Sequence, residues 1–195
     1  SAASSGNGIL INAATAATPV FATADSAAQL IGPTATRTII GDGAITATNG
    51  YIKYAGNASV SGLMTAGTGI TFSGGATYSL TNTSNSAPII SASIGSGALT
   101  YQYTGPMTIG TVASITGITA GAVTLTQNGT SISVVNRTTI DSAISASSLS
   151  VAGGQIVLTS NGSVSTSGSI TLQPGTNNAL EIYKSGSGIV STGSG

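Results

Sequence analysis

The chain has 195 residues and a formal net charge of zero, and only 4% of its residues are charged, where ordinary soluble domains have about a quarter. The balanced charge excludes a basic surface for nucleic acid, and the absence of cysteine excludes disulfides and thiolate metal sites. The 40% of hydrophobic residues argue against disorder, and no apolar run is long enough for a transmembrane segment.

The N-terminal segment, residues 1–32, differs in composition from the rest, since it is rich in alanine and leads into the pair Gly32-Pro33. We therefore expect a strand-bearing segment over residues 1–32 and a β-domain over residues 33–195. The run of small residues that starts at Ser1 is typical of the end left by signal-peptide removal. It predicts an extracellular or cell-surface protein.

Within this segment, a strand is expected at residues 8–12, and a second apolar group follows at residues 19–21. Many fibres polymerise through a strand that pairs with a neighbouring subunit. The residues expected to form such an inter-subunit strand are Ile9, Leu10, Ile11, Val20 and Phe21. The alternative is an edge strand that packs on its own domain.

Two short segments carry weak helix signals. Residues 26–30 follow a capping Asp25 and stop before Gly32-Pro33, and residues 139–146 contain Asp141-Ser142, which can begin a helical turn. Elsewhere glycines recur every few residues, and β-branched side chains dominate between them. This composition disfavours helix and suits strands.

Short strands are expected over the remainder, because apolar residues recur in i, i+2 pairs, the pattern of half-buried strands. Turns rich in Gly or Asn-Gly separate these pairs, for example at residues 49–50, 74–75, 128–129 and 161–162. The pairs are Ile9/Ile11, Ile52/Tyr54, Ile70/Phe72, Tyr78/Leu80, Tyr101/Tyr103, Val123/Leu125, Ile132/Val134, Leu149/Val151, Ile156/Leu158, Ile170/Leu172 and Leu180/Ile182.

Two all-β architectures fit this pattern. The short strands, the scarcity of aromatic residues and the many small side chains favour a β-solenoid, whose core is thin and stacked. The lack of a fixed repeat of about 20 residues favours a β-sandwich. The sequence leaves both open, with an N-terminal strand that is either exchanged between subunits or kept.

Residues 153–175, which read GGQIVLTSNGSVSTSGSITLQPG, resemble the coils of filamentous-haemagglutinin-type β-helix adhesins. In that family, GG-x-I-x-L strands alternate with corners of Ser, Thr, Asn and Gly. The resemblance covers about residues 131–190 and implies a secreted β-helix with inward-facing side chains at Ile156, Leu158, Val164, Ile170 and Leu172. The secretion domain of that family has no recognisable counterpart in this chain.

The sequence offers no catalytic, cofactor-binding or metal-ligating residue set. Without His and Cys, neither a Ser-His-Asp nor a Cys-His constellation can form. The acids Asp25, Asp42, Asp141 and Glu181 are too scattered to suggest a carboxylate pair or a calcium loop. We therefore expect no enzyme activity and no cofactor.

Asn-x-Ser/Thr sequons, which are acceptors for N-glycosylation, occur at Asn57, Asn82, Asn128, Asn136 and Asn161. In a chain so rich in Ser and Thr, this number is close to what chance gives. Asn128 and Asn161 lie in expected turns, so they are predicted to be the most accessible acceptors.

Threonine pairs in i, i+2 spacing, such as Thr124 and Thr126, suggest the flat hydroxyl ladders of ice-binding solenoids. The pairs do not recur at a constant interval along the chain. The sequence therefore gives no support for a flat array of Thr-x-Thr pairs.

The sequence as a whole predicts a non-enzymatic, fimbria- or pilus-like structural subunit. It would associate with copies of itself into an extracellular filament or surface layer by β-pairing, because few Lys and Pro residues protect its strand edges. The alternative is an adhesin or fibre segment that binds carbohydrate or a cell surface. Tyr101, Tyr103 and Tyr78 are the only candidate platform for a glycan, and a core position is favoured for them.

Overall fold

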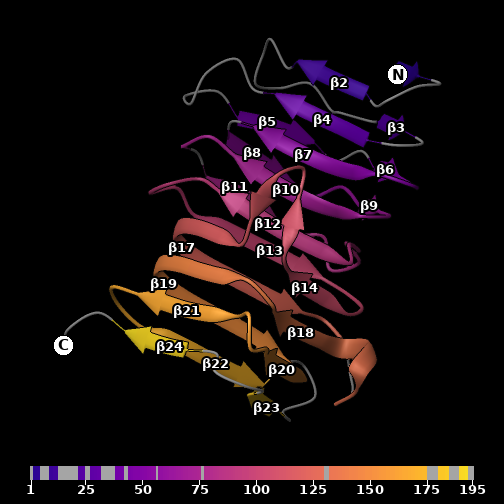
Figure 1. Ribbon diagram of the computed structural model, residues 1–195. Helices are drawn as coiled ribbons and strands as arrows, with labels where there is room; N and C mark the ends of the chain where they lie inside the picture. The colour runs from indigo at the N-terminus through magenta and orange to yellow at the C-terminus, as the bar shows by residue number, and fades with distance from the viewer. Residues whose placement is uncertain are drawn as a thin grey trace.

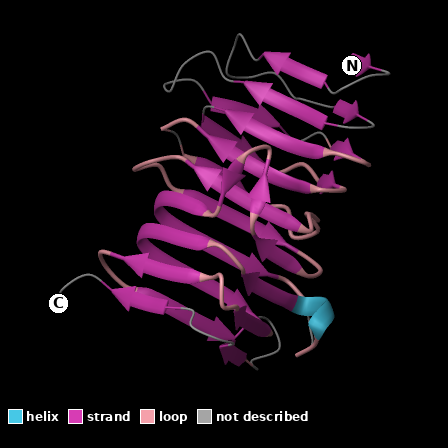
Figure 2. Ribbon diagram, viewed as in Figure 1, coloured by secondary structure: helices cyan, strands magenta, loops and turns pink. Residues whose placement is uncertain are grey.

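The computed structural model describes residues 2–4, 9–12, 22–24, 27–31, 38–41, 44–55, 57–75, 77–129, 132–174, 180–184 and 189–192. Over these residues the chain is nearly all β, apart from one turn of 3-10 helix, η1 (Val134–Asn136). Figure 2 shows the strands stacked in coils from one end of the molecule to the other. Within these ranges, no helix has the length and apolar character needed to cross a membrane.

Parallel pairing between successive coils defines the architecture. Ile52 pairs with Ile70, and Ile70 pairs in turn with Ile90, so each coil lies directly beside the next. The described strand pairs are parallel, with the exception of the hairpin between β15 (Thr111–Val112) and β16 (Ile115–Thr116). The all-β prediction is therefore confirmed, and the fold is the solenoid rather than the sandwich, whose neighbouring strands are antiparallel.

Each coil contributes strands to parallel sheets that run along the molecule (Figure 1). The first sheet contains β1 (Ala2–Ser4), β3 (Ala22–Ala24), β6 (Ile45–Ala47) and β9 (Met64–Ala66). The second begins with β2 (Ile9–Asn12), β4 (Ala27–Ile31), β7 (Tyr51–Ala55), β10 (Gly69–Ser73) and β12 (Ile89–Ser93). The third begins with β5 (Thr38–Gly41), β8 (Asn57–Val60), β11 (Tyr78–Leu80) and β13 (Leu99–Tyr103).

After β12 the second sheet divides into two. Its first half continues through β14 (Met107–Ile109), β18 (Arg137–Ile140), β20 (Gln155–Leu158) and β23 (Glu181–Lys184). Its second half continues through the starts of β17 (Ile118–Gln127) and β19 (Ala143–Gly153), then β21 (Ser163–Thr166) and β24 (Ile189–Thr192). The later parts of β17 and β19, with β22 (Ile170–Pro174), extend the third sheet.

The strands β17 and β19 thus turn a corner between two sheets without interruption. In β17 the corner is at Gly121, where an added Cβ would lie 2.4 Å from the carbonyl oxygen of Ser96 in the previous coil. No side chain fits at that distance, so the corner requires glycine.

Insertions hide the repeat in the sequence. Ile109 pairs with Ile140, and Ile140 pairs with Leu158, so the first of these coils is much longer than the second. The longer coil contains both the β15–β16 hairpin and the segment that carries η1. Because coil length varies while register is kept, a search for a fixed period fails.

The β15–β16 hairpin packs on the outside of the solenoid against β10 and β12. Val112 is buried there, and beneath the hairpin the outward side chains of Thr71 and Ser91 are also buried, with the Ser91 hydroxyl donating to Thr71 Oγ1 at 2.8 Å. Ala113 and Ser114 at its tip have φ values of 48° and 68°, the left-handed region used by the tightest hairpin turns. The hairpin therefore covers polar side chains on the outer surface that would otherwise be exposed to water.

Both helix predictions are wrong. Residues 27–31 form β4, which lies between β2 and β7, and residues 139–146 fall in β18 and β19, which pair with strands of the coils before and after them. Asp25 and Ser26 lie outside the described residues. The ladders on both sides of each strand outweigh a short capping signal, since isolated helices of this length are marginal in water.

The expected strand at Ile132 and Val134 is also wrong, because this segment carries η1 and both side chains are exposed. The other expected pairs lie in or directly beside strands. A local alternation of apolar residues forms a strand only where neighbouring coils supply strand partners. Residues 132–136 belong to an insertion and pair with no described strand.

An aromatic cluster fills the middle of the core. Phe72 stacks on Tyr54 with ring centroids 5.8 Å apart, and its centroid lies 5.0 Å from that of Tyr78 and 6.5 Å from that of Tyr101. Tyr101 in turn stacks on Tyr103 at 5.5 Å. All five rings are fully buried, so the tyrosines considered as a glycan platform belong to the core, as the favoured interpretation predicted.

Two neighbouring tyrosines of this cluster are expected to respond in opposite ways to loss of their hydroxyl. The Tyr103 hydroxyl is hydrogen-bonded to Thr138 Oγ1, whereas the buried Tyr101 hydroxyl has no partner among the described residues. Tyr101→Phe should raise the free energy of unfolding by about 1 kcal/mol, and Tyr103→Phe should lower it by about 1 kcal/mol. Urea unfolding of both variants checks this, and equal effects of the same sign would contradict it.

Candidate functional site

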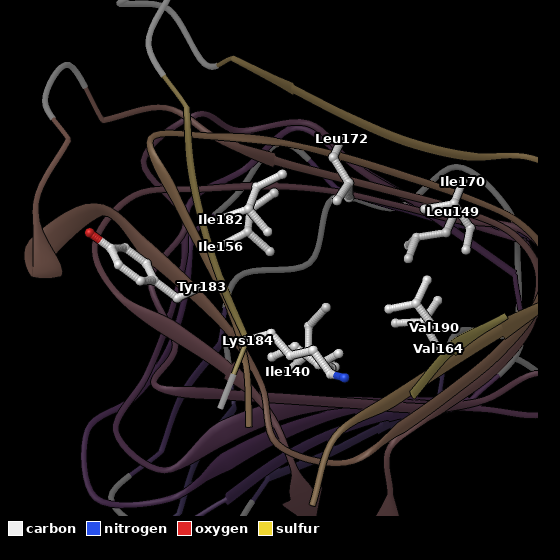
Figure 3. A pocket seen from close by; sticks show the side chains of 11 residues that line it. Ile140, Leu149, Ile156, Val164, Ile170, Leu172, Ile182, Tyr183, Lys184 and Val190 are labelled. Carbon is white, nitrogen blue, oxygen red and sulfur yellow. The ribbon is translucent and has the colours of Figure 1, made fainter. Parts of the chain in front are cut away.

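At the C-terminal end of the solenoid, the described residues leave the core open. Within the described part of the chain, β22, β23 and β24 pair on one side only, with β19, β20 and β21. An apolar cavity of about 190 Å³ opens between them, and Figure 3 looks into it. Its lining residues are Ile140, Leu149, Ile156, Leu158, Val164, Ile170, Leu172, Ile182, Tyr183, Lys184 and Val190.

The last strands place apolar side chains in water. Ile182 is 55% exposed and Val190 is 56% exposed, although each pairs in register with a buried residue, Ile156 and Val164. In the interior of the solenoid the same positions are covered by the next coil. The exposed apolar surface therefore follows from the open end and not from a change in side-chain direction.

Lys184 is the one charged residue, among those that the structure describes, that lines this cavity. It pairs with Leu158, which is buried, and in Figure 3 its side chain extends from β23 along the rim of the opening, while Tyr183 points away from it. Glu181, three residues earlier, faces the other side of the strand, because residues an odd number of positions apart on a strand point to opposite faces.

On the outer side of the same strands, three coils are joined by a ladder of polar side chains. Arg137, Gln155 and Glu181 are aligned in register, and the Arg137 Nε–H donates to Gln155 Oε1. Gln155 Nε2 donates to Glu181 Oε2 at 3.1 Å, and the Tyr183 hydroxyl donates to the same oxygen at 3.1 Å. The hydrogen bond to the Glu181 carboxylate, together with its charge, raises the pKa of Tyr183. The glutamine thus links the two opposite charges.

Outward hydroxyls form an aligned column on the third sheet, although their spacing along the chain is uneven. Adjacent strands in a sheet lie about 4.7–4.9 Å apart, so the hydroxyls repeat at that distance. The Thr-x-Thr spacing itself does not recur from coil to coil, as the sequence indicated, because Thr126 pairs with Gln102 and with Ala152. The aligned column is a single row of mixed Ser and Thr, and uneven coil lengths hide its register in the sequence. The column consists of Ser59, Ser79, Thr100, Thr124, Ser150 and Thr171.

The only sequence signal for this column is indirect. Each member lies between two apolar residues, as Thr124 lies between Val123 and Leu125, although the neighbours of Ser59 and Thr100 are not among the pairs identified in the sequence. Alignment of the pairs, rather than a search for Thr spacing, would have brought the hydroxyls together.

A shallow groove runs along the corner between the second and third sheets, with a volume of about 440 Å³. One side carries the aligned hydroxyls of Thr119, Ser145 and Ser165, and the floor contains Ala120 and Ala146. The described residues that line the groove present hydroxyl and methyl groups and carry no charge.

The sequons differ in their surroundings. Asn161 is exposed, as predicted, whereas Asn128 is partly buried and its amide donates to the carbonyl oxygens of Tyr103 at 3.1 Å and Thr126 at 3.3 Å. Asn136 is buried and its Oδ1 accepts from Gln127 Nε2 at 3.1 Å.

Asn82 is partly buried and its amide donates to the Ser61 carbonyl oxygen at 2.9 Å. The Asn57 side chain lies outside the described residues, although its backbone begins β8. Among the sequons whose side chains are described, Asn161 is thus the most open acceptor.

The N-terminal strand pairs within its own chain. Ile9, Leu10 and Ile11 belong to β2, which pairs in parallel with β4. Val20 and Phe21 lie outside the described residues. In the part of the chain that the structure describes, β2 has no strand on its other side, so its main-chain edge there is unpaired.

Two of the four acids, Asp141 and Glu181, are among the described residues, and they make separate contacts. The Asp141 carboxylate accepts hydrogen bonds from Thr159 and from Asn161, the latter at 3.4 Å, and Glu181 belongs to the ladder with Gln155. Asp25 and Asp42 lie outside the described residues. Among the described residues, no group of three or more acids, histidines or cysteines lies close enough together to hold a metal ion.

The inward positions that the resemblance implied are confirmed. Ile156, Leu158 and Val164 are buried, and Ile170 and Leu172 pack against the core from the open end.

No family model, curated protein or solved structure matches the chain.

Proposed function

We propose that the protein is a structural subunit that associates with copies of itself, end to end, into an extracellular filament or surface layer. The observation that supports this is the pair of open ends. At the C-terminal end the edges of β22, β23 and β24 surround an exposed apolar cavity, and at the N-terminal end β1 and β2 each pair on one side only within the described residues.

The chemistry of the coil-to-coil contact supports the same proposal. Inside the molecule, successive coils are joined by parallel main-chain ladders and by columns of apolar side chains. A second copy placed on the open end would extend both, because an unpaired strand edge is a template for further pairing. Such a contact needs no ion pairs, which suits a chain with only 4% charged residues.

Sedimentation velocity over a range of concentrations, at low salt and at about 1 M salt, tests the proposal. At 1 M salt, interactions between exposed charges are screened beyond about 3 Å. Association by β-pairing does not depend on such charges, so it should persist or strengthen at 1 M salt. Negative-stain microscopy of the same samples should show filaments or stacked layers. A monodisperse monomer at every concentration would contradict the proposal.

A second candidate function is that of an adhesin or fibre segment that binds a neutral glycan. The observation that favours it is the uncharged groove along Thr119, Ser145 and Ser165, whose hydroxyls recur from coil to coil. Binding on a glycan array should be lost in Ser145→Tyr, which fills the groove, and kept in Thr104→Tyr, which is exposed elsewhere. Binding that survives Ser145→Tyr would exclude this groove.

A further inference from the structure

One inward column of the core ends in a charge. Along the second sheet, Ile52, Ile70, Ile90, Ile109, Ile140 and Leu158 follow one another in register through successive coils, and all six are buried. The next member of the column is Lys184, which pairs with Leu158. An unbroken aliphatic stack is thus closed by a lysine at the open end.

If this end is covered, the described lining of the opening offers the Lys184 ammonium group no acidic partner. Its surroundings in the opening are aliphatic, with Ile140, Leu158 and Val164 among them. The nearest acid along the strand, Glu181, is engaged with Gln155 and Tyr183 on the opposite side of the strand. A further coil on this end would take the charge out of water without an acid of the cavity lining to pair with it, and this disfavours the contact.

The strands at the other end of the molecule bring no counter-charge. β1 contains Ala2, Ala3 and Ser4, and β2 runs from Ile9 to Asn12, so neither carries an acid. An inward-pointing charge at a sheet edge is one of the devices by which natural proteins prevent further pairing. At this end, Pro174 closes β22 in addition, and proline lacks the N–H that a ladder requires.

From this geometry we propose that Lys184 limits end-to-end association at the C-terminal end of the solenoid, with the N-terminal edge of a second copy as the occupant. The inference rests on the proposed function, because it concerns the regulation of the same contact. A second copy fits this end by continuity, because β22, β23 and β24 extend the sheets that already join the coils, and β1 and β2 present parallel edges of the same kind.

Sedimentation of three proteins tests the role of the charge. Lys184→Met keeps the length of the side chain and removes the charge, whereas Lys184→Arg keeps the charge. The concentration for half-association should fall at least tenfold in Lys184→Met, which corresponds to about 1.4 kcal/mol, and should stay at the wild-type value in Lys184→Arg. Lys184 is exposed, so neither change is expected to disturb folding.

A double variant assigns the effect to this end. Val190 lines the same opening and is 56% exposed, so Lys184→Met with Val190→Lys returns a charge to the surface that a second copy would cover. It should return association to the wild-type level. Association that stays high in the double variant would place the contact elsewhere and overturn the inference.

The outcomes separate the two proposals. If the wild type associates and Lys184→Met associates equally, the role of Lys184 is wrong and the structural function stands. If only Lys184→Met associates, the role of Lys184 is supported and wild-type self-assembly is contradicted. If no variant associates at any concentration, both are wrong.

Discussion

Raising the pH above about 10 is expected to unfold the protein, although it has few acids and no histidine. Burial raises the pKa of Tyr54, Tyr101 and Tyr103 far above the ordinary value of 10.0. The folded protein therefore keeps these hydroxyls protonated at a pH where the unfolded chain releases their protons. Since the unfolded state then binds fewer protons than the folded state, the free energy of unfolding falls as the pH rises.

The expected size of this effect is large. Each buried tyrosine contributes a slope of up to about 1.4 kcal/mol per pH unit above pH 10, so the three together give about 4 kcal/mol per unit. A domain with a stability of about 5–15 kcal/mol should then unfold within a few pH units of pH 10. Urea unfolding at intervals from pH 9 to pH 12 measures the slope directly.

Two controls accompany the alkaline measurement. Tyr101→Phe should reduce the slope by about one third, since one of the three groups is lost. Between about pH 2 and pH 9 the melting temperature should change little, because the chain has only four acids and no histidine. A constant stability up to pH 12, or a fall of tens of degrees at acid pH, would contradict the account of the core.

Truncation of Phe72 is expected to be the most damaging single change in the core. The ring is fully buried and touches the rings of Tyr54, Tyr78 and Tyr101, which come from three different strands. Phe72→Ala removes the centre of the cluster and leaves a cavity, so the free energy of unfolding should fall by about 3–5 kcal/mol. Urea or thermal unfolding provides the measurement.

The matched control is Tyr183→Ala, since Tyr183 is an aromatic residue on β23 that is 50% exposed. Its free energy of unfolding should stay within about 0.5 kcal/mol of the wild-type value, as for most surface substitutions. Comparable losses in both variants would show that Phe72 does not lie at the centre of a packed cluster.

Much of the fold can be predicted from the sequence, because the inward side chains of each strand in a solenoid appear as apolar residues at positions i and i+2. Tyr78/Leu80 and Ile156/Leu158, for example, identify both a strand and the side that faces the core. The coil-to-coil register cannot be predicted in this way. It depends on which pair stacks on which, and the insertions before Ile140 make the step from coil to coil uneven along the chain.

The candidate site depends on this register and is therefore mostly hidden from the sequence. Lys184 looks like an ordinary solvated charge until Leu158 and Ile140 are found beneath it in one column. The aligned hydroxyls, such as Thr100 and Thr124, are likewise invisible as a column until their strands are paired. Local composition indicates which side chains lie on each face of a strand. The pairing of strands between coils determines which of these side chains become neighbours.

Hydrogen exchange of the wild-type protein at low and high concentration tests end-to-end β-pairing most directly. When copies associate, amides in β22–β24 and in β1 and β2 should exchange more slowly, because main-chain ladders form across the contact, whereas amides in the central strands β12 and β13 should not change. Association without added protection in the terminal strands, or with protection confined to the outer sheet faces, would contradict the account.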